Sequence, residues 1–138
     1  MGHLNIVRRG RDDETGAAAV EFAIVLPLLL MLVLGGLDWG YYFFVAQVTT
    51  NAAREGARAG SLELVDSATN NAVIATVANY LQRAGLDPNR ATVTTPPFLV
   101  DGGDTVRVDV VYPAGSLTGF IKVIVPANAH ATSEMRRH

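Results

Sequence analysis

A continuous apolar segment near the N-terminus constrains this sequence more than any other feature. From Phe22 to Leu37 the chain carries no charged residue, and residues 17–20 extend the apolar stretch, with Glu21 as the one interruption. A helix of about 20 residues crosses a hydrocarbon core of about 30 Å. The sequence therefore predicts one membrane-spanning helix, which leaves room for a single small domain in a chain of 138 residues.

The charges that flank the segment predict its orientation. Arg8, Arg9 and Arg11 precede it, whereas the first positive residue after it is Arg54. Loops that stay in the cytoplasm carry an excess of Lys and Arg. We therefore expect a cytoplasmic N-terminus and an extracytoplasmic C-terminal domain.

Aromatic residues follow the apolar segment directly. Trp39, Tyr41 and Tyr42 stand where amphipathic rings prefer the junction of lipid tails and headgroups, so we predict a membrane-interface belt, with Asp38 as a snorkelling or interfacial acid. A cleaved secretory signal peptide is the alternative, but it requires a small-residue cleavage site directly after the apolar run. No such site stands there, so the sequence favours a retained anchor.

The residues GAAAVEF, Gly16–Phe22, lie between a short charged leader and the apolar helix. They resemble the processing site of type IV prepilins, which a membrane-embedded prepilin peptidase cuts after the glycine. The resemblance implies cleavage between Gly16 and Ala17, with Glu21 as the fifth mature residue, where the family carries its glutamate. The mature chain would begin with Ala, not with the Phe that is common in type IVa pilins.

A longer stretch, Thr15–Ser61, resembles TadE-like proteins, the minor pilins or pseudopilins of tight-adherence (Tad) pilus systems. It covers about one third of the chain. The resemblance implies a structural subunit of a type IVb-like pilus, held in the bacterial inner membrane or incorporated into a cell-surface pilus that serves adherence and secretion. The implied partners are membrane lipid, prepilin peptidase, other pilin subunits and the assembly machinery. Major pilins of this type are typically much shorter, which favours a minor role.

Glu21 is the anomaly of the apolar segment, because an ionisable residue inside a membrane usually has a partner. Cleavage after Gly16 would release an α-amine one helical turn away from Glu21. Pairing between this amine on one subunit and Glu21 on its neighbour would neutralise both charges and set the axial register of an assembly. In the alternative interpretation, Glu21 lies at headgroup depth and is solvated.

Two pairs of glycines have the GxxxG spacing, which places both residues on one helix face and lets another backbone approach. Gly36 and Gly40 suit packing against another subunit. Gly56 and Gly60 are the weaker candidates, because Gly60 is expected to end the helix. The helix would then span residues 17–59, about 60 Å, so that about half of it projects beyond the membrane.

The remainder of the chain predicts a small α+β domain. The stripe of Val73, Val77, Tyr80, Leu81 and Ala84, ended by Gly85, indicates a second short helix that Asp66 or Ser67 caps. Alternation predicts strands at 91–95 and 105–112, a hairpin around the DGGD turn at 101–104, and one or two strands within 120–135. We thus expect a leader at 1–16, the helix at 17–60, and a domain at 61–138 with an antiparallel sheet of three to four strands.

Composition excludes several classes of function. The net charge is −2, with no basic run after residue 11, so nucleic acid is not an expected partner. The chain has no cysteine, His130 is expected to point outward on a strand, and two aspartates in DGGD are too few ligands for calcium. We expect no catalytic site, metal, cofactor or small-molecule substrate. We also do not expect the protein to be an enzyme. The alternative to the pilin hypothesis is an unprocessed, signal-anchored binding module.

Overall fold

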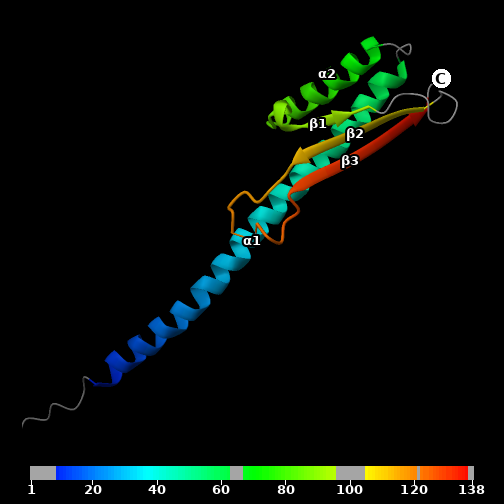
Figure 1. The fold of residues 1–138 in the computed structure, drawn as a ribbon. Coiled ribbons are helices and arrows are strands. Elements are labelled where there is room, and N and C mark those ends of the chain that lie inside the picture. The colour runs from blue at the N-terminus through cyan, green and yellow to red at the C-terminus, as the bar shows by residue number, and fades with distance from the viewer. Residues whose placement is uncertain (1–8, 63–66, 96–104, 121, 137–138) are drawn as a thin grey trace, which may run out of the picture.

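The computed structural model describes residues 9–62, 67–95, 105–120 and 122–136 (Figure 1). It confirms the α+β class, with a long N-terminal apolar helix, a second short helix and a three-stranded antiparallel sheet. In chain order the elements are α1 (Arg9–Leu62), α2 (Ser67–Arg83), the short 3-10 helix η1 (Pro88–Arg90), and the strands β1 (Thr92–Thr94), β2 (Thr105–Pro113) and β3 (Asn128–Arg136).

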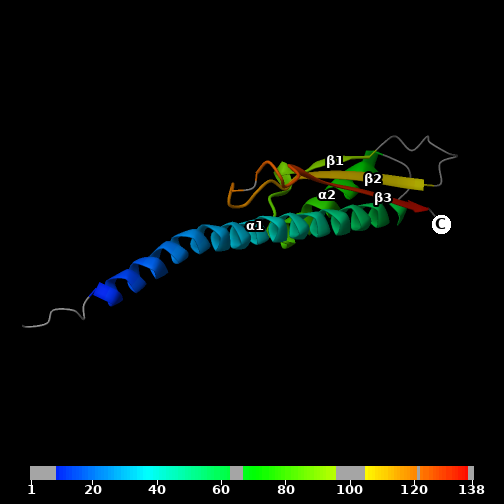
Figure 2. The same cartoon turned by 90° about the horizontal axis from the view of Figure 1, so that it is seen from below.

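Helix α1 is longer at both ends than the predicted 17–59. It begins at Arg9, continues through Pro27 with a gentle bend in its N-terminal part (Figure 2), and ends at Leu62. The prediction that Gly60 ends the helix was wrong. Gly60 is buried in the packed part of the helix, and the hydroxyl of Ser61 donates to the carbonyl of Arg58 at 2.8 Å, so the last turn is completed beyond the glycine.

The sheet has the strand order β1-β2-β3, and both pairs are antiparallel. The predicted period of two is confirmed in β2, where the alternate residues Val106, Val108, Val110 and Tyr112 are buried. His130 on β3 is exposed, as expected, and lies opposite Val111 in the register. One face of the sheet is therefore apolar and the other polar.

Both helices lie on the apolar face of the sheet (Figure 2), and the core lies between these two layers. Val73, Val77 and Leu81 of α2 are fully buried, which confirms the predicted stripe. Gly85 has φ of 80°, a left-handed conformation that ends the helix as predicted. The cap at Asp66 and the hairpin turn at 101–104 lie outside the described residues.

Gly56 allows α1 and α2 to approach closely. A Cβ atom at this position would lie 2.7 Å from Cγ2 of Val77, so a side chain here would force Val77 or its helix to shift. Gly56 and Gly60 had been the weaker candidates for a helix contact. The structure shows the opposite for Gly56, which lies at a contact between α1 and α2 of the same chain.

A single strand, β3, occupies the region for which one or two were predicted. Before it, the backbone N–H groups of Ala114 and Gly115 donate to the carbonyl of Ala127 at 3.0 and 3.1 Å. These bonds close the base of a loop, called here the β2–β3 loop, whose described residues are 114–120 and 122–127. The apolar residues Phe120, Val123 and Ile124 lie in this loop and are exposed. Apolar composition alone therefore did not distinguish a strand from an exposed loop.

Candidate functional site

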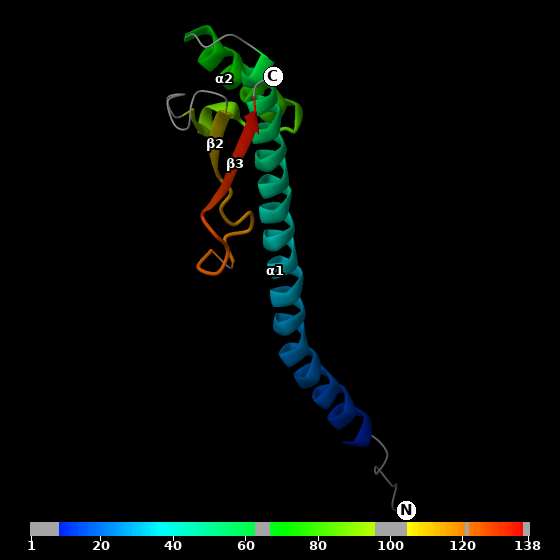
Figure 3. The same ribbon diagram turned by 90° about the vertical axis from the view of Figure 1, so that its right-hand side faces the viewer.

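The N-terminal half of α1 has no packing partner among the described residues. Every residue from Gly16 to Val33 is exposed, and Figures 1 and 3 show this half of the helix extending alone from the folded part of the chain. We call Gly16–Leu37 the span segment. The packed module comprises residues 38–62 of α1, together with α2, the sheet and the β2–β3 loop. The span segment measures about 33 Å at 1.5 Å per residue. Within the described residues, α1 is the one helix long and apolar enough to cross a membrane.

The predicted processing site lies inside this continuous helix. Gly16 and Ala17 are both exposed, and Glu21 follows Ala17 by four residues, which places the two on one face. Glu21 has neither a hydrogen bond nor an ion pair with any described residue. Its carboxylate is therefore available to a group that another molecule supplies.

Gly36 and Gly40 lie at the end of the span segment that adjoins the packed module. Both are exposed, and a Cβ atom added at either would meet no atom within 4 Å. Unlike Gly56, these glycines contact no other described part of the chain. They present a face with no side chain, on which another helix can approach the backbone closely.

Two of the three predicted belt residues, Trp39 and Tyr42, form an aromatic cluster with Phe43 at the start of the packed module. Trp39 packs edge-on against Tyr42, with ring centroids 5.9 Å apart, and lies 5.6 Å from Phe43. Tyr41 and Tyr42 also pack against the core. Phe43, which is not among the predicted belt residues, is largely exposed beside Trp39. The belt residues thus cluster at the boundary between the span segment and the packed module.

Asp38 differs most from its prediction. The sequence predicts a snorkelling or interfacial acid, yet Asp38 is 0% exposed. The hydroxyl of Ser116 donates to Oδ2 at 2.6 Å, the hydroxyl of Thr118 donates to Oδ2 at 2.8 Å, and the backbone N–H of Thr118 donates to Oδ1 at 2.6 Å. Three donors replace the water that a buried carboxylate loses.

These bonds attach the β2–β3 loop to α1 at the first residue after the span segment. Ser116 and Thr118 were not identified from the sequence, because they lie 78 and 80 residues away from Asp38 along the chain. The one sequence signal for this site was an acidic residue directly after an apolar run. Its partners depend on the path of the chain through the sheet.

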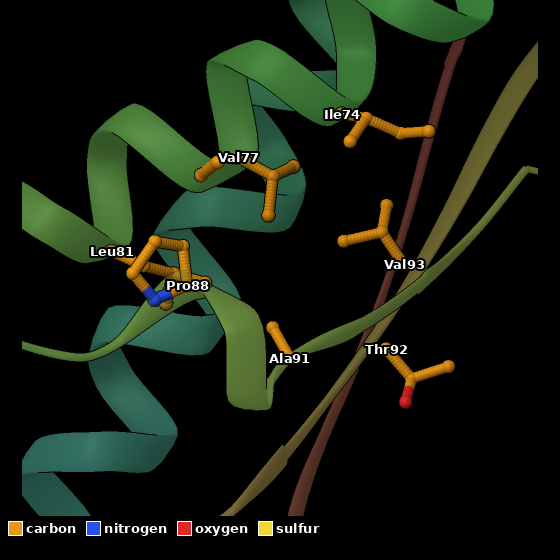
Figure 4. A pocket seen from close by; sticks show the side chains of 8 residues that line it. Ile74, Val77, Leu81, Pro88, Ala91, Thr92 and Val93 are labelled. Carbon is orange, nitrogen blue, oxygen red and sulfur yellow. The ribbon is translucent and has the colours of Figure 1, made fainter.

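An apolar groove separates α2 from η1 and β1 (Figure 4). Its volume is about 360 Å³. Ile74 and Val77 of α2 face Ala91 and Val93 across it. The one polar side chain in its lining is Thr92.

The outer face of the sheet carries exposed charges. Nε of Arg107 lies 3.4 Å from Oδ2 of Asp109, and Nη1 of Arg107 lies 3.7 Å from Oε1 of Glu134. These are surface ion pairs, which contribute little to stability. Among the described residues, no three His, Asp or Glu side chains are grouped to hold a metal ion. The distinctive features of the chain are therefore the bare span segment and its junction with the packed module.

Comparison with known families confirms the resemblance drawn from the sequence. Residues 16–58 match the family model described as TadE-like protein. The match begins at the glycine of the predicted processing site and ends within α1, before α2 and the sheet. No curated protein and no solved structure matches the chain. The TadE-like match indicates a protein associated with the Tad pilus, and the apolar helix is consistent with a membrane anchor.

Proposed function

We propose that this protein is a structural minor pilin or pseudopilin of a Tad pilus. The observation that carries the proposal is the span segment, a bare apolar helix of membrane length that begins at the glycine where the TadE-like match begins. Before assembly, this helix holds the chain in the bacterial inner membrane. The leader lies in the cytoplasm and the packed module outside.

A prepilin peptidase cuts the chain between Gly16 and Ala17. Both residues are exposed on the helix, which leaves this peptide bond uncovered by the packed module. Cleavage removes the charged leader and leaves a chain whose N-terminus is the apolar helix. The protein is thus the substrate of an enzyme and has no catalytic role of its own.

The cleaved subunit joins other pilin subunits through the span segment. Glu21 of one subunit pairs with the new α-amine at Ala17 of its neighbour, and the face of Gly36 and Gly40 receives another helix. Lipid in the membrane and neighbouring helices in the fibre both offer an apolar environment to the surface of the span segment. Transfer of the subunit from membrane to fibre therefore keeps this surface out of water. Incorporation supports pilus assembly and, through the finished fibre, adherence.

Mass spectrometry of the N-terminus tests the processing step. We expect the protein, extracted from a bacterium with an active Tad system, to begin at Ala17, and Gly16→Val to retain its leader. Gly36→Val is the matched control and should be cleaved normally, since it makes the same change away from the processing site. An intact leader on the unmodified protein would contradict the pilin proposal and favour an unprocessed, signal-anchored binding module.

Glu21→Gln tests the register role, because it keeps the size of the side chain and removes its charge. We expect its amount in sheared pili to fall about tenfold or more, since an α-amine that loses its partner in a low-dielectric site is costly. Glu55→Gln is the control, because Glu55 forms an exposed ion pair with Arg58 in the packed module. Equal incorporation of both variants would exclude the register role of Glu21.

A further inference from the structure

The β2–β3 loop exposes an unusual amount of apolar surface. Leu117, Phe120, Val123 and Ile124 are between 50% and 99% exposed. Outside α1, Ile74 is the one other large hydrophobic residue exposed among the described residues. Exposed apolar residues are therefore concentrated in this loop, which is a sign of an interaction surface.

The loop is held in a defined shape. Its base is closed where Ala114 and Gly115 donate to the carbonyl of Ala127, and Val125 is buried within it. The N–H of Gly119 donates to the hydroxyl of Ser116 at 2.7 Å. The apolar side chains thus project from a structured loop.

The bonds to Asp38 determine where this surface lies. Ser116 and Thr118 bind the carboxylate at the first residue after the span segment. In Figures 1 and 3 the loop is the part of the packed module that lies nearest the N-terminal half of α1. If the span segment occupies the hydrocarbon core, the loop is at the level where the helix leaves it.

The charge of the loop suits a lipid surface. Residues 114–127 contain no acid, and their one charged residue, Lys122, is exposed. A lysine beside apolar side chains can place its ammonium among lipid phosphates while its stem stays in the apolar region. The same composition is typical of segments that lie in a membrane interface.

We infer that the β2–β3 loop is a second membrane contact, which inserts Leu117, Phe120, Val123 and Ile124 into the outer leaflet beside α1. This inference rests on the proposed membrane anchor. Asp38 is then a positioning residue that holds the loop against the helix at the membrane surface. Two contacts restrict the tilt and rotation of the packed module, which presents it in one orientation to the assembly machinery.

Site-directed spin labelling of the full chain in lipid vesicles tests the inference. The natural absence of cysteine means that each introduced cysteine carries the only label. We compare Val123→Cys in the loop, Leu29→Cys in the span segment and Glu134→Cys on the outer face of the sheet, in phosphatidylcholine vesicles with phosphatidylglycerol. Oxygen concentrates in the bilayer and a nickel chelate stays in water, so their relative collision rates with the label report its depth.

We expect the labels at positions 29 and 123 to collide more with oxygen, and the label at position 134 to collide more with nickel. Ile124→Cys repeats the measurement in case the first loop label disturbs the contact. A lipid-exposed label at 29 with water-exposed labels at 123 and 124 would overturn the inference and leave the membrane anchor intact. A water-exposed label at 29 would refute the anchor itself. Protection of the loop labels from both reagents, lost on dilution with lipid, would assign the loop to a second copy of the chain instead.

Discussion

The two halves of α1 belong to one continuous helix, yet the half with the more apolar side chains is exposed and the other half is packed. In the span segment the side chains are large and apolar, and Leu32 is 73% exposed. After Asp38 the side chains are mostly smaller or more polar, and Ala52 and Ala57 are fully buried. Burial within the chain therefore does not follow hydrophobicity, because the most apolar surface requires an environment outside the chain.

In the packed half of α1, small residues are required because neighbouring elements lie close to the helix. The sheet and α2 both approach α1 closely, and Gly56 has no space for a Cβ beside Val77. Larger side chains would hold the layers apart and leave the core of this small module incompletely packed. The bare half faces no such restriction. Its residues need only match an apolar surrounding, so equal substitutions in the two halves should have unequal effects.

The largest difference is expected from shortening a buried leucine. Leu81→Ala should lower the free energy of unfolding of the packed module by about 2–5 kcal/mol, because Leu81 is fully buried in the hydrophobic core. Leu29→Ala removes the same atoms from the exposed span segment and should leave the module unchanged. Denaturant unfolding of the full chain in detergent micelles, followed by the near-ultraviolet circular dichroism of its tyrosines, measures both. Equal losses would show that the span segment also packs against the module.

A slightly smaller difference in unfolding free energy is expected when either of two glycines is replaced by valine. Gly56→Val should destabilise the module by about 3 kcal/mol, since the new side chain would overlap Val77. Gly36→Val should not, because a Cβ atom at that position would meet no atom of the described residues within 4 Å. The same unfolding measurement applies. A harmless Gly56→Val would mean that α2 can move away from α1 without loss of core packing.

The smallest of the three effects is expected at the junction between the halves. Asp38→Ala removes the acceptor for three hydrogen bonds and should cost about 1–3 kcal/mol, since the N–H of Thr118 loses its partner. Hydrogen exchange should increase mainly in the β2–β3 loop. Asp38→Asn is the matched control, because its carbonyl oxygen can still accept a bond, so its effect should be smaller. Unchanged exchange in Asp38→Ala would show that the loop is held by its closed base alone.

Local properties of the sequence predicted most of the fold. The length of the apolar run gave the span segment, the helical stripe of Val73, Val77 and Leu81 gave α2, and alternation gave β2. The start and end of α1 were less accurately predicted. The helix continues past Gly60, which is buried, and burial is set by tertiary packing that no local pattern reports.

By itself, then, the sequence determined that one helix would be too apolar for water, that a short helix and strands would follow, and that residues 16–58 would match TadE-like proteins. Apolar length and periodicity are local, so they can be read along the chain. The tertiary structure alone decided that Asp38 is buried, that Gly56 contacts α2, and that the residues before β3 form a loop beside α1. Each of these joins residues far apart in the sequence, and the contact exists only because the sheet and both helices pack together.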